Sequence, residues 1–169
     1  MLLPLRAFLL LSLLLALGGS RPPHPAGAVR WLTPQALADS MRVRPRPVLV
    51  NIYTPSCRYC KLQDLTTFRD KDVVSRLNAR FYAVALNAES REPIRLGGHT
   101  FTFQATGPDN GVHGLALALA RDEHGQVVYP TVVLLDEKLE VRGRWPGLIK
   151  AGQLRAALNK LAPGPAAAP

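Results

Sequence analysis

The chain has 169 residues, of which 47% are hydrophobic and 20% are charged. This length and balance predict one globular domain with a buried core, and they exclude a largely disordered protein. The formal net charge is +9, but no run of Lys or Arg is longer than two residues, so a solvated basic surface is its simplest explanation.

Residues 1–20 have the layout of a secretory signal peptide. Arg6 precedes an apolar run from Ala7 to Leu17, and small residues follow. Because this run is shorter than the roughly 20 residues that span a bilayer, a retained membrane anchor is the less favoured alternative. We expect cleavage after Ser20, or as late as Ala28. The protein is then exported to the periplasm or secreted, and its charge favours acidic partners or anionic surfaces over nucleic acid.

The ends of the chain are unlike its middle. Residues 21–28 are rich in Pro and Gly and are interpreted as a linker, and residues 162–169 are interpreted as a disordered tail. One folded domain is therefore expected over residues 29–161.

The first half of this domain predicts helices and strands in alternation. Thr33 caps a helix that reaches about Met41, with Pro34 at its first position. The segment Val48–Tyr53 is apolar at both odd and even positions, which is typical of a central parallel strand covered on both faces. The remaining expected elements are a helix capped by Ser56 and running to Phe68, a helix capped by Asp70 and running to Asn78, and a strand over Phe81–Leu86.

An insertion is expected over Glu89–Gly111. It holds a predicted hairpin between residues 94 and 103 that turns at Gly97 and Gly98, near one edge of the sheet, followed by a loop. Its role is either partner selection or protection of the sheet edge. The chain is then expected to continue as a helix over 112–120, strands over 131–135 and 141–145, and a helix over 150–161.

Both cysteines lie in the segment TPSCRYCK, residues 54–61, where they are a redox pair, half of a metal site, or two core residues. Cys57 falls in the first turn of a predicted helix, where the partial positive charge and the neighbouring Arg58 and Lys61 stabilise a thiolate. Cys60 lies one turn further on nearly the same face. This geometry suits attack on a disulfide by Cys57 and release of the product by Cys60.

Asp64 follows Cys60 by one helical turn and is a candidate acceptor for its proton, although a surface carboxylate paired with Lys61 or Arg58 is the more favoured explanation. A copper or zinc site needs more ligands than two thiolates. The candidates for those ligands are His99, His113 and His124, which would have to converge on the cysteines.

Three segments together resemble the thioredoxin superfamily. They are Cys57–Lys61, Tyr129–Thr131 before an apolar strand, and residues 146–154 leading into the last helix. The similarity spans residues 29–161 and is greater to exported thioredoxin-like domains, which include the C-terminal domain of the membrane thiol:disulfide interchange protein. It implies an α/β thioredoxin-like fold, with a central mixed sheet flanked by helices and an inserted hairpin before the third main helix.

The resemblance also implies an activity, that of a thiol:disulfide oxidoreductase with Cys57 as nucleophile and Cys60 as resolving thiol. Pro130 is then the cis proline that faces the two cysteines, and Tyr129, Arg58 and Tyr59 contact the client. No organic cofactor is implied, because the electrons reside in the dithiol. The expected partners are protein thiols or disulfides and a separate membrane electron donor or acceptor, and the protein is expected to be a monomer.

Three departures from the family pattern matter. Ser56 replaces the usual aromatic residue before the first cysteine, and Asn51 replaces a buried acid, so it cannot accept a proton. Pro130 lies 73 residues after Cys57, further than in a minimal thioredoxin.

The resemblance favours reduction of protein disulfides over their oxidation. The alternatives are a non-catalytic binding module and a copper or zinc protein that uses both cysteines.

Overall fold

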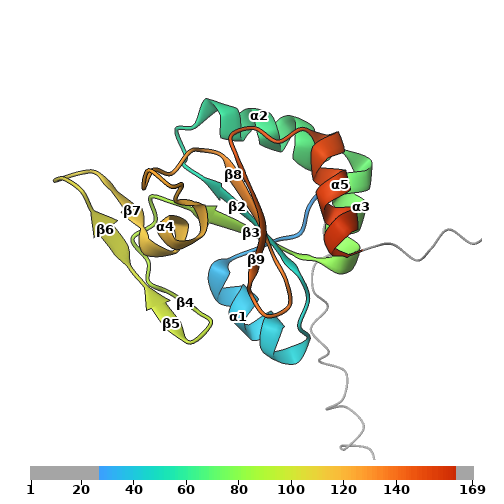
Figure 1. Ribbon diagram of the computed structural model, residues 1–169, viewed down its shortest axis with the longest axis horizontal. Coiled ribbons are helices and arrows are strands. Elements are labelled where there is room, and N and C mark those ends of the chain that lie inside the picture. The colour runs from blue at the N-terminus through green and yellow to red at the C-terminus, as the bar shows by residue number, and fades with distance from the viewer. Residues whose placement is uncertain (1–26, 163–169) are drawn as a thin grey trace, which may run out of the picture.

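The computed structural model describes residues 27–162 (Figure 1). The predicted signal peptide, most of the predicted linker and nearly all of the predicted tail lie outside these residues. Within them, no helix is both long enough and apolar enough to cross a membrane.

A five-stranded mixed sheet forms the centre of the molecule, with the strand order β1-β3-β2-β8-β9. β3 pairs in parallel with both β1 and β2, whereas β8 is antiparallel to its two neighbours. This arrangement confirms the expected α/β fold with a mixed sheet. The strand bounds are β1 (Trp31–Leu32), β2 (Val48–Tyr53), β3 (Tyr82–Asn87), β8 (Thr131–Leu135) and β9 (Val141–Pro146).

Helices cover both faces of the sheet, because β2 is apolar on both (Figure 1). Val50 and Ile52 lie in a buried cluster with side chains of α1 and α4, whereas Leu49 lies in a second cluster with side chains of α3 and α5. The helix bounds are α1 (Pro34–Val43), α2 (Arg58–Thr66), α3 (Lys71–Arg80), α4 (Gly114–Ala120) and α5 (Ala151–Leu161).

Two of the predicted helix caps are confirmed. The Thr33 hydroxyl accepts a hydrogen bond from the Ala36 backbone N–H, and the Asp70 carboxylate accepts from the backbone N–H groups of Asp72 and Val73. Both helices end two residues later than expected. The predicted helix over residues 56–68 is shorter in the structure, because α2 ends at Thr66 and a 3₁₀ turn, η1 (Thr67–Arg69), follows.

The strand β1 was not expected from the sequence. It has only two residues, and its pairing with Ala83 and Val84 of β3 makes it an edge strand of the sheet. Two residues are too few to show a period, so the sequence pattern carries no signal for it.

The insertion contains two hairpins, each a separate two-stranded sheet. The first is the hairpin predicted from the sequence, and the second was not predicted. The first joins β4 (Ile94–Leu96) to β5 (His99–Phe101) through Gly97 and Gly98, both of which have positive φ. The second joins β6 (Phe103–Ala105) to β7 (Gly111–His113), where the sequence predicted a loop and the start of a helix.

Glycine explains the second hairpin. A Cβ on Gly111 would lie 2.4 Å from the backbone oxygen of Gln104, so only glycine permits this close pairing of strands. The following helix, α4, begins at Gly114 rather than Val112, because His113 is its N-cap: the ring Nδ1 accepts a hydrogen bond from the Leu115 backbone N–H at 3.1 Å. The backbone N–H of His113 also donates to Ala88 O, which ties the insertion to the end of β3.

Candidate functional site: the cysteine pair and its surroundings

Cys57 and Cys60 lie just beyond the end of β2, where the chain enters α2, and they form a disulfide with their Cα atoms 5.3 Å apart. Cys57 is the N-cap of α2, and its Sγ accepts a hydrogen bond from the Cys60 backbone N–H at 3.0 Å. The expectation that Ser56 caps this helix was therefore wrong. Cys57 is half-buried and Cys60 is only 3% exposed, so Cys57 is the more accessible of the two cysteines.

Pro130 lies at the same end of the sheet as the disulfide. β2 and β8 are antiparallel, and Ile52 near the end of β2 is the partner of Thr131 at the start of β8. The residue before Thr131 is therefore beside the point from which the chain leaves β2 toward Cys57. The Tyr129–Pro130 peptide bond is cis, and Pro130 O accepts a hydrogen bond from Gly147 N at 2.7 Å.

The other side chains expected to contact a client differ in exposure. Tyr129 is half-buried, and its removal from water together with the negative charge of Glu89 raises the pKa of its hydroxyl. Arg58 and Tyr59, which separate the two cysteines, are both exposed, and 66% of Tyr59 is accessible.

Beneath α2 lies a buried amide network that the sequence did not reveal. Gln63 is fully buried, and its Nε2 donates to Asn51 Oδ1 at 3.1 Å while its Oε1 accepts from the Ile149 backbone N–H at 2.9 Å. The network joins β2, α2 and the segment before α5. The sequence holds one sign of this network: Gln63 shares a helix face with Cys60, whereas Leu62 and Leu65 lie on another face.

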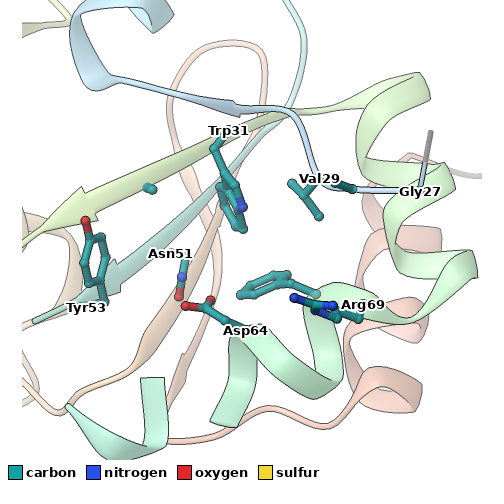
Figure 2. A pocket seen from close by; sticks show the side chains of 10 residues that line it. Gly27, Val29, Trp31, Asn51, Tyr53, Asp64 and Arg69 are labelled. Carbon is teal, nitrogen blue, oxygen red and sulfur yellow. The ribbon is translucent and has the colours of Figure 1, made fainter. Parts of the chain in front are cut away.

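Asp64 lines a cavity of about 630 Å³ that lies between α2 and the start of the described chain (Figure 2). Its carboxylate points toward Asn51, while Trp31 and Phe68, whose rings meet edge to face at 4.8 Å, form an apolar wall. Partial removal from water raises the pKa of the Asp64 carboxyl above its ordinary value. Asp64 makes no ion pair with Lys61 or Arg58, the surface pairing that the sequence left open.

The three histidines among residues 27–162 form no metal-binding group with the two cysteines. His113 is fully buried at the start of α4, where both of its ring nitrogens have hydrogen-bond partners, and His124 lies in an exposed turn. His99 is on β5 in the insertion. Within residues 27–162, no group of three or more His, Cys, Asp or Glu side chains is placed to hold a metal ion.

Comparison with known proteins identifies the family. The model of a thioredoxin-like domain matches residues 35–162, so the chain belongs to the thioredoxin-like family. No curated protein is similar enough in sequence to match the chain.

Two solved structures with TM-scores above 0.5 support the fold, and a third structure matches with a lower score. A thioredoxin from Thermus thermophilus is 21% identical with a TM-score of 0.54, covering 79% of this chain and 86% of its own. A putative disulphide-isomerase from Bacteroides thetaiotaomicron is 22% identical with a TM-score of 0.53, covering 80% and 94%. The C-terminal domain of DsbD from Neisseria meningitidis is 18% identical with a TM-score of 0.48, covering 75% and 90%.

Proposed function

We propose that this protein is an exported thiol–disulfide oxidoreductase that reduces disulfides in other proteins. The observation that carries the proposal is the Cys57–Cys60 pair, placed at the N-terminus of α2 in a chain of the thioredoxin-like family. The pair itself stores the two electrons, so the reaction requires no organic cofactor.

The unequal burial of the two cysteines supports a division of roles. The accessible Cys57 attacks a client disulfide as a thiolate, forms a mixed disulfide, and releases one client sulfur. The thiolate of Cys60 then attacks Cys57 Sγ, which releases the second client sulfur and forms the Cys57–Cys60 disulfide. Two electrons pass to the client, whose sulfurs each take up one proton. The N-terminus of α2 and the adjacent Arg58 favour the Cys57 thiolate.

Asp64 is the proposed acceptor of the Cys60 proton. Asn51 occupies the position of the usual buried acid and its amide cannot accept a proton, whereas Asp64 faces the same cavity with a raised pKa. We expect Asp64→Asn to slow the step in which Cys60 resolves the mixed disulfide. In the native protein this step slows as the pH falls through the raised pKa of Asp64, because the protonated acid accepts no proton. Stopped-flow measurement of product release across pH tests this role.

A matched control is Asp72→Asn, which removes an exposed carboxylate from α3. It is expected to leave the pH profile unchanged. If Asp64→Asn has the same profile as the native protein, the proton leaves Cys60 by another route.

Tyr129 and Pro130 form the proposed client platform, together with Arg58 and Tyr59. The support is their place: Pro130 is beside the end of β2, and the two exposed side chains lie between the cysteines. A trapping experiment tests the whole site. Cys60→Ser is expected to accumulate mixed disulfides with client proteins, whereas Cys57→Ser accumulates none, and equal trapping by both variants contradicts the assignment of the nucleophile.

The direction of electron flow is decided by the equilibrium reduction potential of the pair. We would measure it by thiol alkylation across a glutathione or dithiothreitol series. A value near about −270 mV supports a reductase that a separate membrane donor recharges, and one near about −120 mV makes the protein an oxidant. Arg58 favours the second outcome, because it stabilises the reduced form. If no reversible couple is found, the enzyme proposal fails and a binding module or metal protein replaces it.

Export and a monomeric state are parts of the same proposal. The layout of residues 1–20 supports export. N-terminal sequencing of the secreted or periplasmic protein is expected to begin at Arg21 or Val29. Recovery of the intact N-terminus in the membrane fraction supports the retained anchor instead. Light scattering of the purified protein tests whether it is a monomer.

A further inference from the structure

The helix α2 has its apolar side chains on the outside. Its buried positions are taken by Cys60 and by Gln63, a polar residue held by two hydrogen bonds. Its large apolar side chains are exposed instead: Tyr59 is 66% accessible, Leu62 46% and Leu65 62%. Helices of soluble proteins normally bury such residues, and an apolar surface left in water marks a binding site more often than chance.

These side chains form one stripe that begins at the disulfide. Tyr59 stands between the two cysteines, Leu62 follows it by three residues, and Leu65 follows Leu62 by three, so successive members are neighbours on the helix surface. From Cys57 to Leu65 the helix rises about 12 Å. An extended peptide covers that length in about four residues.

A groove receives the far end of the stripe. Leu62 and Leu65 line it from α2, and Leu148, 36% exposed, lines it from the segment between β9 and α5. Its volume is about 550 Å³, and Ala151 at the start of α5 adds to the apolar lining. Figure 1 shows α5 lying beside α3, and no element among residues 27–162 is drawn over the outer side of α2.

The charges around the groove are positive. Arg58 and Lys61 each lie one helical turn before a leucine of the stripe, and Lys150 is part of the groove lining. None of the three makes an ion pair with a carboxylate among residues 27–162. Asp70, which also lines the groove, is engaged by the α3 backbone and by Arg155. Asp64 is turned into the other cavity (Figure 2).

We propose that this groove binds the client polypeptide, by holding an apolar side chain about four residues from the client cysteine while Lys61 and Lys150 bind acidic residues beside it. The occupant is therefore an acidic segment with a leucine-like side chain. This inference rests on the proposed function, because the groove is useful to a client only if Cys57 reacts with it. The continuity of the stripe with the disulfide favours such a client over a lipid surface or a second copy of this chain.

The test uses synthetic peptides that contain one cysteine in a mixed disulfide with glutathione. One peptide carries Leu four residues from the cysteine, flanked by Glu; two others replace Leu with Ser, or Glu with Lys. We expect kcat/KM for the Leu and Glu peptide to exceed that of each other peptide by about tenfold, which is the effect of partly burying one leucine side chain. Reduction of glutathione disulfide alone measures activity without the groove.

Variants then locate the preference. Leu65→Ser is expected to abolish the preference for Leu, and Lys150→Glu to reverse the preference for Glu. The matched control is Val43→Ser, which changes an apolar residue that is 88% exposed at the end of α1 and outside the groove. It is expected to leave every preference intact. Circular dichroism checks that each variant is folded.

The outcomes separate this proposal from the proposed function. If the native protein reduces glutathione disulfide but treats all peptides alike, the groove proposal is overturned and the enzyme stands. If it reduces no disulfide, the enzyme proposal fails. The groove is then tested by calorimetric binding of the Leu and Glu peptide with Ser in place of Cys, and binding lost in Leu65→Ser supports it. A dimer, or adhesion to anionic vesicles, that Leu65→Ser abolishes in place of peptide binding overturns it.

Discussion

The consecutive helices α2 and α3 pack on the same face of the sheet, but they bury opposite kinds of side chain. α3 buries Val73, Val74 and Leu77 and presents polar side chains to water. α2 buries Cys60 and Gln63 and exposes Leu62 and Leu65. The difference indicates that the sequence of α3 serves the core, whereas that of α2 serves the disulfide and whatever contacts the outer surface of the helix.

The two helices also differ in the residue that caps their N-terminus. Asp70 caps α3 with a carboxylate, which is among the most favoured caps, and adds an ion pair to Arg155 of α5 at 2.8 Å. Cys57 caps α2 with a sulfur, which is a weak acceptor. The start of α3 therefore adds to stability, while the start of α2 keeps a reactive atom at the surface.

The largest expected effect is on the core side of the comparison. Leu77→Ala removes a fully buried side chain of α3 and is expected to lower the free energy of unfolding by about 2–5 kcal/mol, because a cavity remains. Urea unfolding followed by circular dichroism measures it. A loss below about 1 kcal/mol contradicts the view that α3 holds the core together.

Gln63→Leu is expected to cause the next largest loss of stability. The substitution fits the volume of the site but leaves Asn51 Oδ1 and the Ile149 N–H without their partner, so we expect a loss of about 1–3 kcal/mol in the free energy of unfolding. The same urea experiment measures it. If the variant is as stable as the native protein, the buried side of α2 accepts an apolar side chain as α3 does. The polar residue at this position then does not distinguish the two helices.

Asp70→Ala is expected to cost about 1 kcal/mol at neutral pH, the usual value of a lost cap. Hydrogen bonding by the Val73 N–H, helped by Arg155, holds the pKa of Asp70 below its ordinary value. The native cap therefore contributes fully above the unfolded pKa of about 3.9, and this contribution is lost as the pH falls through the lower native pKa. The stability difference between variant and native protein should shrink below about pH 4, and a difference that grows there refutes this account.

The smallest effect is expected for Leu65→Ser. Because most of this side chain is already in water, the free energy of unfolding should change by no more than about 0.5 kcal/mol. Compared with Leu77→Ala, it shows that leucines on adjacent helices differ in purpose. A large loss of stability for Leu65→Ser means that the leucine contributes to the core after all.

Most of the fold was predictable from the sequence, since Val48–Tyr53 and Thr131–Leu135 are continuous apolar runs and Thr33 and Asp70 are standard caps. The second hairpin was missed, because its pairing depends on the missing Cβ of Gly111, and a run of Gly, Pro and Asp otherwise indicates a loop.

The candidate site was predictable in part. The spacing of the cysteines identifies them in the sequence, but the role of Gln63 depends on two partners that are 12 and 86 residues away in the chain. Local patterns carry no information about such pairings. The exposed leucines of α2 depart from the usual amphipathic pattern of a helix. This departure could be interpreted only after the structure showed that α3 follows the usual pattern.

His113 makes the stability of the insertion dependent on pH. Its Nδ1 accepts from the Leu115 N–H and its Nε2 therefore carries the ring proton toward Glu92 O, so the imidazole is fully used in its neutral form. Burial lowers the pKa of this ring below its ordinary value. The unfolded chain takes up the proton first, at about pH 6.5, and the stability that His113 contributes declines as the pH falls from there. The contacts of His113 with the Leu115 N–H and with Glu92 O therefore contribute most to the stability of the insertion at neutral pH, and they contribute less as the pH falls below about 6.5.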